Sequence, residues 1–391
     1  MTTGEDEFAA IESQIVTLKP IIEAHAAEAE EQRFLSNEVA HAMAEAGLYR
    51  VAAPRSLDGA EAHPITQIKT IEAVSRIHGS TGWNLMIGIE NMGILGAVYD
   101  RNVTEQLYAD PGLIIAGSLN PLGKAVRESG GYRINGQWPF CSGVHNAQYF
   151  WSQSIVYDEN GERVRDDHGL VLCESMAPVA QIEIVDTWHV SGLQGSGSHD
   201  VKIQDVFVPD EYISQVMRNI PVESGTLYRL PIFSRLAYNK VGVATGIARA
   251  AIDQFIELAG EKKPRGSANL LQNRIDAQRA VAEAERLIGS ARSYVFDTIL
   301  DLWQTIENGG KPTARQKAVI QLSCSGAANE AVKAVEMLYS AAGASANFLS
   351  SPLGRSMRDV LVVRQHIMVS PQFTEAVGRV LMGMESETFL F

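Results

Sequence analysis

The chain contains few cysteines and no long apolar run. Its three cysteines, Cys141, Cys173 and Cys324, lie far apart and form no Cys-x-x-Cys pair. This spacing argues against a zinc site or a disulfide framework, and the odd number is typical of a reducing compartment. No stretch reaches the roughly 18 apolar residues of a membrane-spanning helix, and the acidic start differs from a signal peptide. We therefore expect a cytoplasmic, soluble protein with no membrane partner.

Several motifs of metal and nucleotide chemistry are also absent. The histidines show neither the HExxH pattern nor another metal-ligand spacing, and there is no GxSxG elbow or Walker A loop. Residues 192–200 contain a Gly-x-Gly without the third glycine of a dinucleotide fingerprint, and the residues that follow alternate like a strand. The sequence therefore predicts no metal site and no Rossmann site, although this turn retains amides and hydroxyls that suit a phosphate or a polar ring edge.

Charge and composition narrow the class further. The formal net charge is -13, with 46 acidic and 33 basic residues. An acidic surface repels phosphate groups, so we expect neither nucleic acid nor an anionic membrane as a partner. Eight of the acids lie within residues 1–33, where the pattern predicts a solvated helix face. A hydrophobic content of 46% over 391 residues is typical of a globular protein with two or three domains.

The period of the hydrophobic pattern changes twice along the chain. Apolar residues first recur at helical spacing, and then short β-type runs alternate with Gly and Pro, with Gly130-Gly131 as a hairpin signal. The remainder is Ala-rich and helical, with long segments typical of a bundle. We predict a multi-domain α+β protein with an N-terminal helical domain (residues 1–110), a central antiparallel, barrel-like β domain (111–222) and a C-terminal four-helix bundle (223–391).

Two segments carry candidate binding residues. In the first, Ser142 follows Phe140 and Cys141 at a predicted strand end, where its hydroxyl is placed to meet a flat ligand while the aromatic ring packs on the ligand's face. The alternative is a strand end closed by a turn. The second segment runs from Gly192 to Asp200, and its polar residues either bind a ligand or cap the turn.

In their order, these segments resemble the acyl-CoA dehydrogenase fold and, more closely, its oxygenase branch, the two-component flavin-dependent monooxygenases. The resemblance covers nearly the whole chain and rests on residues 79–83 (GSTGW), 138–143 (WPFCSG), 192–200 (GLQGSGSHD) and 358–366 (RDVLVVRQH). Dehydrogenases of this fold carry a TExxxGSD segment, where this chain has GSLNPLG at 117–123, and a late carboxylate base, where it has Gln365-His366. The oxygenase is thus the first interpretation, and the alternatives are a dehydrogenase-like oxidation of an acyl thioester and a non-catalytic flavin protein.

The resemblance also implies roles for single residues. Ser142 would lie near the flavin N5 atom, and His366 would face the substrate and take its proton. Phe140 falls where the dehydrogenases have a flavin-stacking Trp, and Trp83 lies in a helix segment that lines the ring pocket in the oxygenase branch. Arg265 and Arg292 are candidate partners of a flavin phosphate, with solvated helix faces as the alternative. The implied flavin-binding set is Trp83, Phe140, Cys141, Ser142, Gly195, Ser196, Ser198 and His199.

The implied reaction needs several partners. Reduced FMN or FAD, supplied by a separate NAD(P)H:flavin reductase, would react with O2 through a C4a-hydroperoxyflavin and hydroxylate an aromatic or heteroaromatic small molecule. The resemblance further implies a homotetramer, which is compatible with Ala-rich helix faces. With no metal or phosphate-loop motif in the sequence, the chemistry is expected to come from the flavin.

Overall fold

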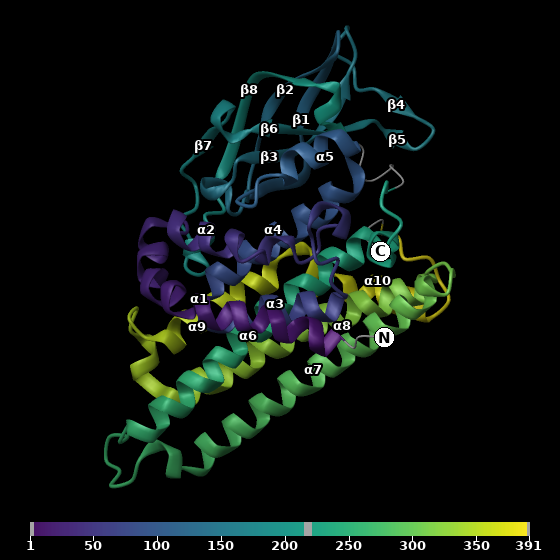
Figure 1. Cartoon of the computed structure of the whole chain (residues 1–391). Coiled ribbons are helices and arrows are strands. Elements are labelled where there is room, and N and C mark those ends of the chain that lie inside the picture. The colour runs from purple at the N-terminus through teal and green to yellow at the C-terminus, as the bar shows by residue number, and fades with distance from the viewer. Residues whose placement is uncertain (1–3, 215–220, 389–391) are drawn as a thin grey trace.

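The computed structural model describes residues 4–214 and 221–388. Along the chain a sheet region lies between two helical regions, and in space the sheet lies at one end of the molecule with both helical regions on the same side of it (Figure 1). The first helical region comprises α1 (Gly4–Gln32), α2 (Asn37–Glu45), α3 (Pro64–Ile77), α4 (Gly79–Val98) and α5 (Arg101–Tyr108). The strands are β1 (Ile115–Glu128), β2 (Gly131–Trp138), β3 (Tyr149–Tyr157), β4 (Arg165–Asp166), β5 (Gly169–Leu170), β6 (Leu172–Pro178), β7 (Glu183–Val185), β8 (Asp200–Pro209) and β9 (Ile213–Ser214). The second helical region comprises α6 (Ile232–Glu261), α7 (Ile275–Glu307), α8 (Ala314–Ala342), α9 (Pro352–Gln365) and α10 (Phe373–Leu381).

The main sheet has seven strands in the order β7-β8-β2-β1-β3-β6-β9. β1 and β3 are parallel, whereas the other neighbouring strands are antiparallel. The chain crosses over between β2 and β3, so β3 pairs with the free side of β1 instead of folding back on β2. Within the described residues β7 and β9 do not pair with each other, so the sheet is open. The predicted antiparallel, barrel-like domain is therefore not confirmed, because the sheet is mixed and unclosed.

Strand β1 is longer than the sequence pattern indicated. Two short apolar runs on either side of Pro121 belong to one strand, whose register with β3 shifts between Ser118 and Gly123. Such an irregularity accommodates a proline within a strand. A Cβ atom at Gly123 would lie 2.2 Å from both Ser154 Oγ and Trp138 Cζ2, so glycine is required there. The hairpin predicted at Gly130-Gly131 is confirmed, and Gly130 has a φ of +80°.

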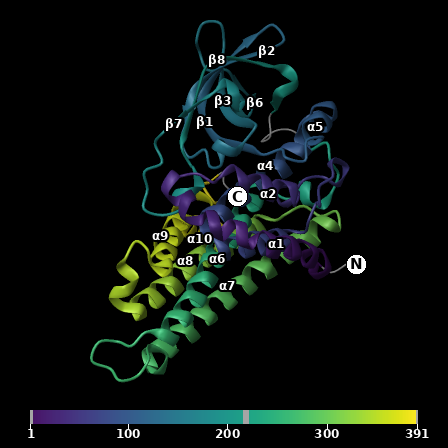
Figure 2. The same ribbon diagram turned by 60° about the vertical axis from the view of Figure 1, so that its left-hand side comes forward.

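Helix α4 packs between the two helical regions and is buried on nearly all sides. Its glycines permit close packing, since a Cβ atom at Gly82 would lie 1.9 Å from Ser75 Oγ, and one at Gly88 would lie 2.2 Å from a Tyr49 ring atom. α4 packs against α3 and α6, and α6 also packs against α7, α8 and α9. Figures 1 and 2 show α1–α4 between the sheet and the long helices α6–α8. Among the described helices, none has the length and apolar character needed to cross a membrane.

Candidate functional site

Two loops of the sheet region meet beside α4. One follows β2 and carries Phe140 to Gly143, and the other precedes β8 and carries Leu193 to His199. β2 and β8 are antiparallel neighbours with Trp138 opposite Val201, so the two loops leave the sheet at adjacent points. Two backbone hydrogen bonds join them, from Cys141 N to His199 O (2.9 Å) and from Gly143 N to Ser196 O (3.1 Å). Sheet register thus brings together two segments that are more than 50 residues apart in the sequence.

A series of buried hydrogen bonds runs from α4 across both loops. Trp83 Nε1 donates to Ser142 Oγ (3.0 Å), which lies 2.7 Å from Ser198 Oγ, and Ser198 Oγ lies 2.7 Å from Ser196 Oγ. If Ser196 donates to Ser198 and Ser198 to Ser142, the two lone pairs of Ser142 are used and its own hydrogen is available to a ligand. We call Trp83, Ser142, Ser196 and Ser198 the serine series; all four had been predicted as site residues.

Phe140 lies next to this series with its ring uncovered. Its exposed fraction is 65%, although it is a large apolar residue, and its φ of +62° is in the left-handed region. That conformation is uncommon for a bulky residue and costs on the order of 1–3 kcal/mol. The ring contacts Trp188 edge-on, with centroids 6.2 Å apart. The loop therefore holds an exposed aromatic face beside Ser142, as the predicted stacking role requires.

His366 approaches the series from the other side, between α9 and the short helix η10 (Ile367–Val369). Its ring lies edge-on to Trp83, with centroids 5.6 Å apart. Met368 N donates to His366 Nδ1 (3.2 Å), so the neutral ring carries its hydrogen on Nε2. Burial and the positive charge of Lys240 lower the pKa of His366 well below the ordinary 6.5. The ring is therefore neutral near pH 7, and its pKa is not the unperturbed value assumed from the sequence.

Buried carboxylates on two helices hold the second loop. Glu30 of α1 accepts hydrogen bonds from Gly195 N (3.2 Å), Ser80 Oγ (2.6 Å) and His78 Nε2 (3.1 Å). Burial opposes ionisation of Glu30, but His78, Ser80 and the Gly195 amide together lower its pKa to about 2. The Glu30 side chain is only 13% exposed, so the solvated helix face predicted for residues 1–33 is wrong at this position.

Asp359 of α9 is the second carboxylate at this loop. Its Oδ1 atom accepts a hydrogen bond from Leu193 N at 2.7 Å. Burial and the nearby charge of Glu30 raise the pKa of Asp359 to about 7. Sequence reasoning assigned no role to Glu30 or Asp359. The Arg358-Asp359 pair of the late motif was the one signal that pointed to this position.

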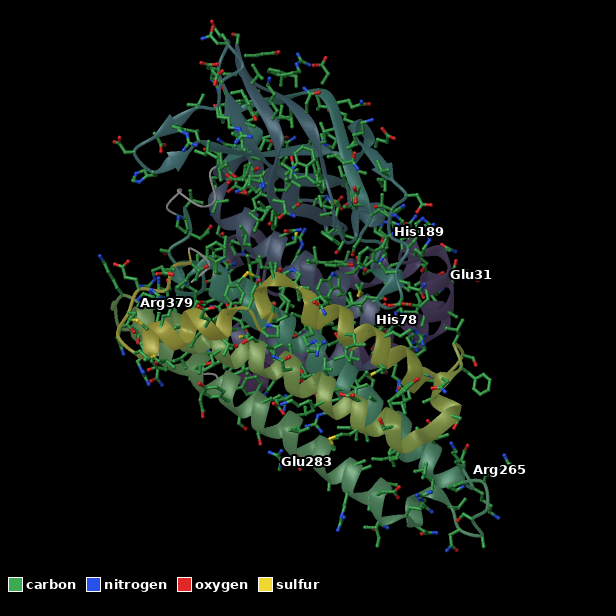
Figure 3. All side chains as sticks on the ribbon, turned by 180° about the vertical axis from the view of Figure 1, so that it is seen from behind. Glu31, His78, His189, Arg265, Glu283 and Arg379 are labelled. Atoms are coloured by element: carbon green, nitrogen blue, oxygen red, sulfur yellow. The ribbon has the colours of Figure 1, made fainter. Side chains whose placement is uncertain are left out.

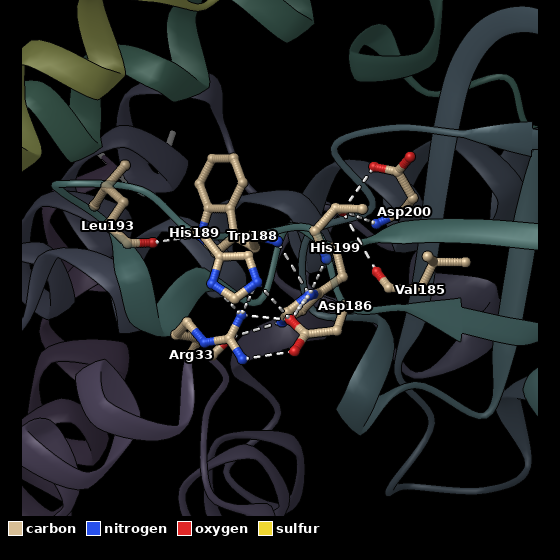
Figure 4. A network of polar contacts seen from close by, with 9 residues as sticks. Arg33, Val185, Asp186, Trp188, His189, Leu193, His199 and Asp200 are labelled. Atoms are coloured by element: carbon tan, nitrogen blue, oxygen red, sulfur yellow. Dashed lines mark hydrogen bonds and ion pairs between the residues drawn. The ribbon is translucent and has the colours of Figure 1, made fainter.

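Two predicted site residues stabilise the loops and lie outside the serine series. The Cys141 thiol is buried and donates to Trp138 O at 3.1 Å. His199 Nδ1 accepts from the Thr187 and Trp188 amides at 3.2 and 3.3 Å, and burial lowers its pKa. Figure 4 shows this histidine beside the ion pair of Arg33 with Asp186, which ties the end of α1 to the segment after β7.

The remaining predicted residues divide between the site and the bundle. Gly195 contributes backbone groups, because its amide reaches Glu30 and its carbonyl accepts from Asn84 Nδ2 at 3.4 Å. Arg292 is paired with Glu72, with Nε and Oε2 2.8 Å apart. Figure 3 shows Arg265 at the far tip of the bundle, whereas His78 and His189 lie near the junction of helices and sheet. Neither arginine belongs to the serine series.

Known proteins match the chain along most of its length. The family models for the acyl-CoA dehydrogenase N-terminal and C-terminal domains match residues 17–107 and 239–371, together more than half of the chain. The indole-3-acetate monooxygenase of Pseudomonas putida is 29% identical over 92% of this chain and 90% of that protein. The oxygenase subunit HsaA of a flavin-dependent monooxygenase from Mycobacterium tuberculosis is 24% identical over 92% and 91%.

A solved structure shares the complete fold. XiaF from Streptomyces sp., in complex with FADH2 and glycerol, matches with a TM-score of 0.87 at 21% sequence identity, covering 98% of each chain. The domain matches, the full-length relatives and this fold agree with one another. The chain therefore belongs to the acyl-CoA dehydrogenase family, in the branch that contains the flavin-dependent monooxygenases.

Proposed function

We propose that the protein is the oxygenase component of a two-component flavin-dependent monooxygenase that hydroxylates an aromatic or heteroaromatic small molecule. The observation that carries the proposal is the convergence of the serine series, the exposed ring of Phe140 and the neutral His366 at one junction. The relatives named indole-3-acetate monooxygenase and flavin-dependent monooxygenase support it. O2 is the co-substrate, and a separate NAD(P)H:flavin reductase supplies reduced FMN or FAD.

The residues at the junction fit a flavin ring. Phe140 offers a flat apolar face, and Ser142 beside it has a hydrogen available when Ser198 is the donor of their shared hydrogen bond. Asn84 Oδ1 is buried and has no hydrogen-bond partner among the described residues. It lies 2.6 Å from the position that a Cβ of Gly143 would occupy, so it faces the first loop. An isoalloxazine has an apolar face and an edge of donors and acceptors, which matches this set. When bound, the flavin supplies the activation of O2 for transfer of one oxygen atom.

Each side chain then has a definite task. Ser142 would donate its hydrogen to the bound flavin, and Ser198 and Ser196 would fix the direction of that donation. Phe140 and Trp83 would cover the flavin and exclude water from it. Gly195 shapes the loop through its two backbone bonds. Cys141 and His199 hold the loops and contribute no side chain to the ligand.

His366 is assigned to the substrate. Its neutral ring carries Nε2–H, which orients a substrate oxygen by donation. To accept a proton at Nε2, the neutral ring must first carry its hydrogen on Nδ1. In that form Nδ1 no longer accepts the hydrogen bond from Met368 N. The hydrogen bonds of the resting protein therefore favour His366 as a donor that orients the substrate over His366 as a base that takes its proton.

Oxidation of an acyl thioester remains the alternative and lacks a suitable base. Abstraction of an α-proton requires a free carboxylate over the flavin. In the described part of the chain, Glu30 and Asp359 accept backbone amides, and Glu90 is bonded to Lys240 at 2.6 and 2.7 Å. The late position of the base is occupied by Gln365-His366. The site therefore favours oxygenation.

The test is a coupled assay with the full chain. Purified protein, an NADH-dependent flavin reductase, FAD or FMN and a panel of phenols and indoles are incubated under ¹⁸O₂. The proposal expects a product that has gained one ¹⁸O atom, with NADH and O2 consumed in equal amounts. Bleaching of bound flavin by acyl-CoA in the absence of reductase would instead support the dehydrogenase.

We also propose how the chain divides into domains and how many chains assemble. We divide the chain into domains at residues 1–110, 111–222 and 223–391, and we expect a cytoplasmic homotetramer. Light scattering coupled to gel filtration tests the assembly, because a tetramer has about four times the 42.6 kDa mass of one chain.

A further inference from the structure

A second buried polar group lies between α4 and α6, outside the serine series. Lys240 Nζ is 2.7 Å from Glu90 Oε1 and 2.6 Å from Oε2, and both side chains are at most 5% exposed. Glu90 therefore has both oxygens bonded to one ammonium group. The pair contributes no net charge, whether it is ionic or has shared its proton.

Arg235 adds a second positive charge to this group, where it acts on Glu90 and Tyr238. Its exposed fraction is 8%, and its guanidinium carbon lies 5.6 Å from the centroid of the Tyr228 ring. Among the described residues, no Asp or Glu carboxylate lies within 4 Å of the guanidinium. Arginine stays protonated in proteins, and an unpaired buried charge is unfavourable. Glu90, Lys240 and Arg235 together therefore carry one net positive charge, which favours an anion.

Asn239 provides an unused acceptor on the same helix face. It follows Arg235 by four residues, so the two side chains are neighbours on α6. Asn239 is 2% exposed, and its Oδ1 atom has no hydrogen-bond partner in the described parts of the chain. A buried acceptor without a partner favours a ligand with an N–H or O–H group.

These groups lie within reach of the junction that holds Ser142 and His366. Trp83 and Glu90 are seven residues apart on α4 and share one face, about 10 Å apart along the helix axis. η10, which follows His366, packs against α6. The charge of Lys240 lowers the pKa of His366, so the two side chains are electrostatically close. The Lys240–Glu90 pair is thus connected to the junction along α4 and through η10.

We propose that Arg235 and Asn239 form a substrate subsite and that the substrate is an aromatic acid. Arg235 binds the carboxylate, and Asn239 Oδ1 accepts a hydrogen bond from an N–H or O–H group of the ring system. This inference rests on the proposed function, because it names the substrate class of the same site. Glu90, which interacts with Asn239 and Arg235 as well as with Lys240, is the residue that positions both.

Glu61 is the competing partner of Arg235. Its charge also acts on Tyr228, since burial and Glu61 raise the pKa of Tyr228 while Arg235 lowers it. Glu61 is half-buried and lies more than 4 Å from the guanidinium. If Arg235 served only to pair with Glu61, removing both side chains together would leave ligand binding unchanged.

The experiment measures binding to the flavin-loaded protein under anaerobic conditions by calorimetry. The probes are indole-3-acetate, phenylacetate and 4-hydroxyphenylacetate, each with its neutral amide. We expect each acid that binds to do so at least about tenfold more tightly than its amide. R235M should weaken the binding of the acids by about 10- to 100-fold and leave the binding of the amides unchanged. R235K should restore part of the lost affinity. R249M, on the same helix and paired with Glu285, is the matched control and should bind like wild type.

The outcomes separate this inference from the proposed function. Acids that bind no better than amides, including the case in which neither binds, overturn it even if neutral phenols are hydroxylated. Wild-type acid affinity in the R235M/E61Q double variant also overturns it. Tight, Arg235-dependent acid binding without any oxygen transfer upholds the subsite and counts against the monooxygenase.

Discussion

Ser142 illustrates how one hydroxyl is directed toward a ligand. Its oxygen accepts the Trp83 indole N–H at 3.0 Å and lies 2.7 Å from Ser198, so with Ser198 as donor the Ser142 hydrogen is directed to a ligand. S142A should retain flavin binding within a few-fold, because the ring surfaces remain. Its yield of hydroxylated product per NADH should fall by about tenfold as peroxide is released. The yield and the peroxide are measured together, and S142T should recover part of the coupling.

Ser267, in the loop between α6 and α7, provides the control for that change. S267A alters a serine remote from the junction and should leave coupling unchanged. Full coupling in S142A would show that the serine hydroxyl is not the donor to the flavin.

His366 is expected to act on the substrate and not on the flavin. H366A should bind flavin as wild type does but lose hydroxylation by about 10²- to 10⁴-fold, the usual contribution of a positioned acid–base group. NADH oxidation should continue with peroxide as its product. Normal product formation in H366A would remove this residue from the mechanism.

The pH dependence of the same residue follows from its surroundings. Burial and Lys240 lower the pKa of His366, so its neutral form persists as the pH falls from 8 to 6.5 and is lost below that range. We expect the acid limb of the hydroxylation rate below pH 6.5. In the E90Q/K240M double variant the Lys240 charge that acts on His366 is gone and no unpaired Glu90 carboxylate is left, so the limb should move to higher pH. Initial rates from pH 5 to 8 test this shift, and an unchanged limb would exclude Lys240 as its cause.

At the scale of elements, two helices hold one loop through carboxylates. Asp359 keeps its proton up to about pH 7 in the folded chain, because burial and Glu30 raise its pKa from 3.8. The unfolded chain already loses this proton near pH 4, so folding becomes less favourable as the pH rises from 4 to 7. D359N keeps an oxygen for Leu193 N without a charge. It should therefore be more stable than wild type at pH 8, by up to about 4 kcal/mol.

Urea unfolding at pH 5 and pH 8 measures this difference, which should shrink as the pH falls. D253N removes an exposed carboxylate paired with Arg76 on the bundle and should change stability little at either pH. A D359N protein that is less stable at pH 8 would mean that Asp359 is ionised and paired in the folded chain.

Local pattern predicted the elements well where neighbours in sequence decide the structure. The helical period of the first region and the hairpin at Gly130 depend on adjacent residues, and both are present. The parallel pairing of β1 with β3 depends on where the chain crosses after β2, which no local signal encodes. Glu30 looked like a surface acid because its partner, Gly195, lies 165 residues away. Arg235 and Asn239 were missed because nothing in α6 marks an unpaired side chain.

At the scale of the molecule, the proposed ligand lies where sheet and helices meet, so binding should stabilise the whole chain. A ligand at 100 times its Kd stabilises the folded state by about 2.7 kcal/mol. For a chain of 391 residues this corresponds to a rise in Tm of about 3 °C.

The F140G variant separates this effect from general stability, because glycine accepts the φ of +62° and the ring is 65% exposed. The ligand-free variant should melt within a few degrees of wild type, yet its rise with FAD or FMN should be much smaller. Differential scanning fluorimetry with and without flavin measures both values. A full rise in F140G would place the flavin away from this ring, and no rise in wild type would remove the flavin from the junction.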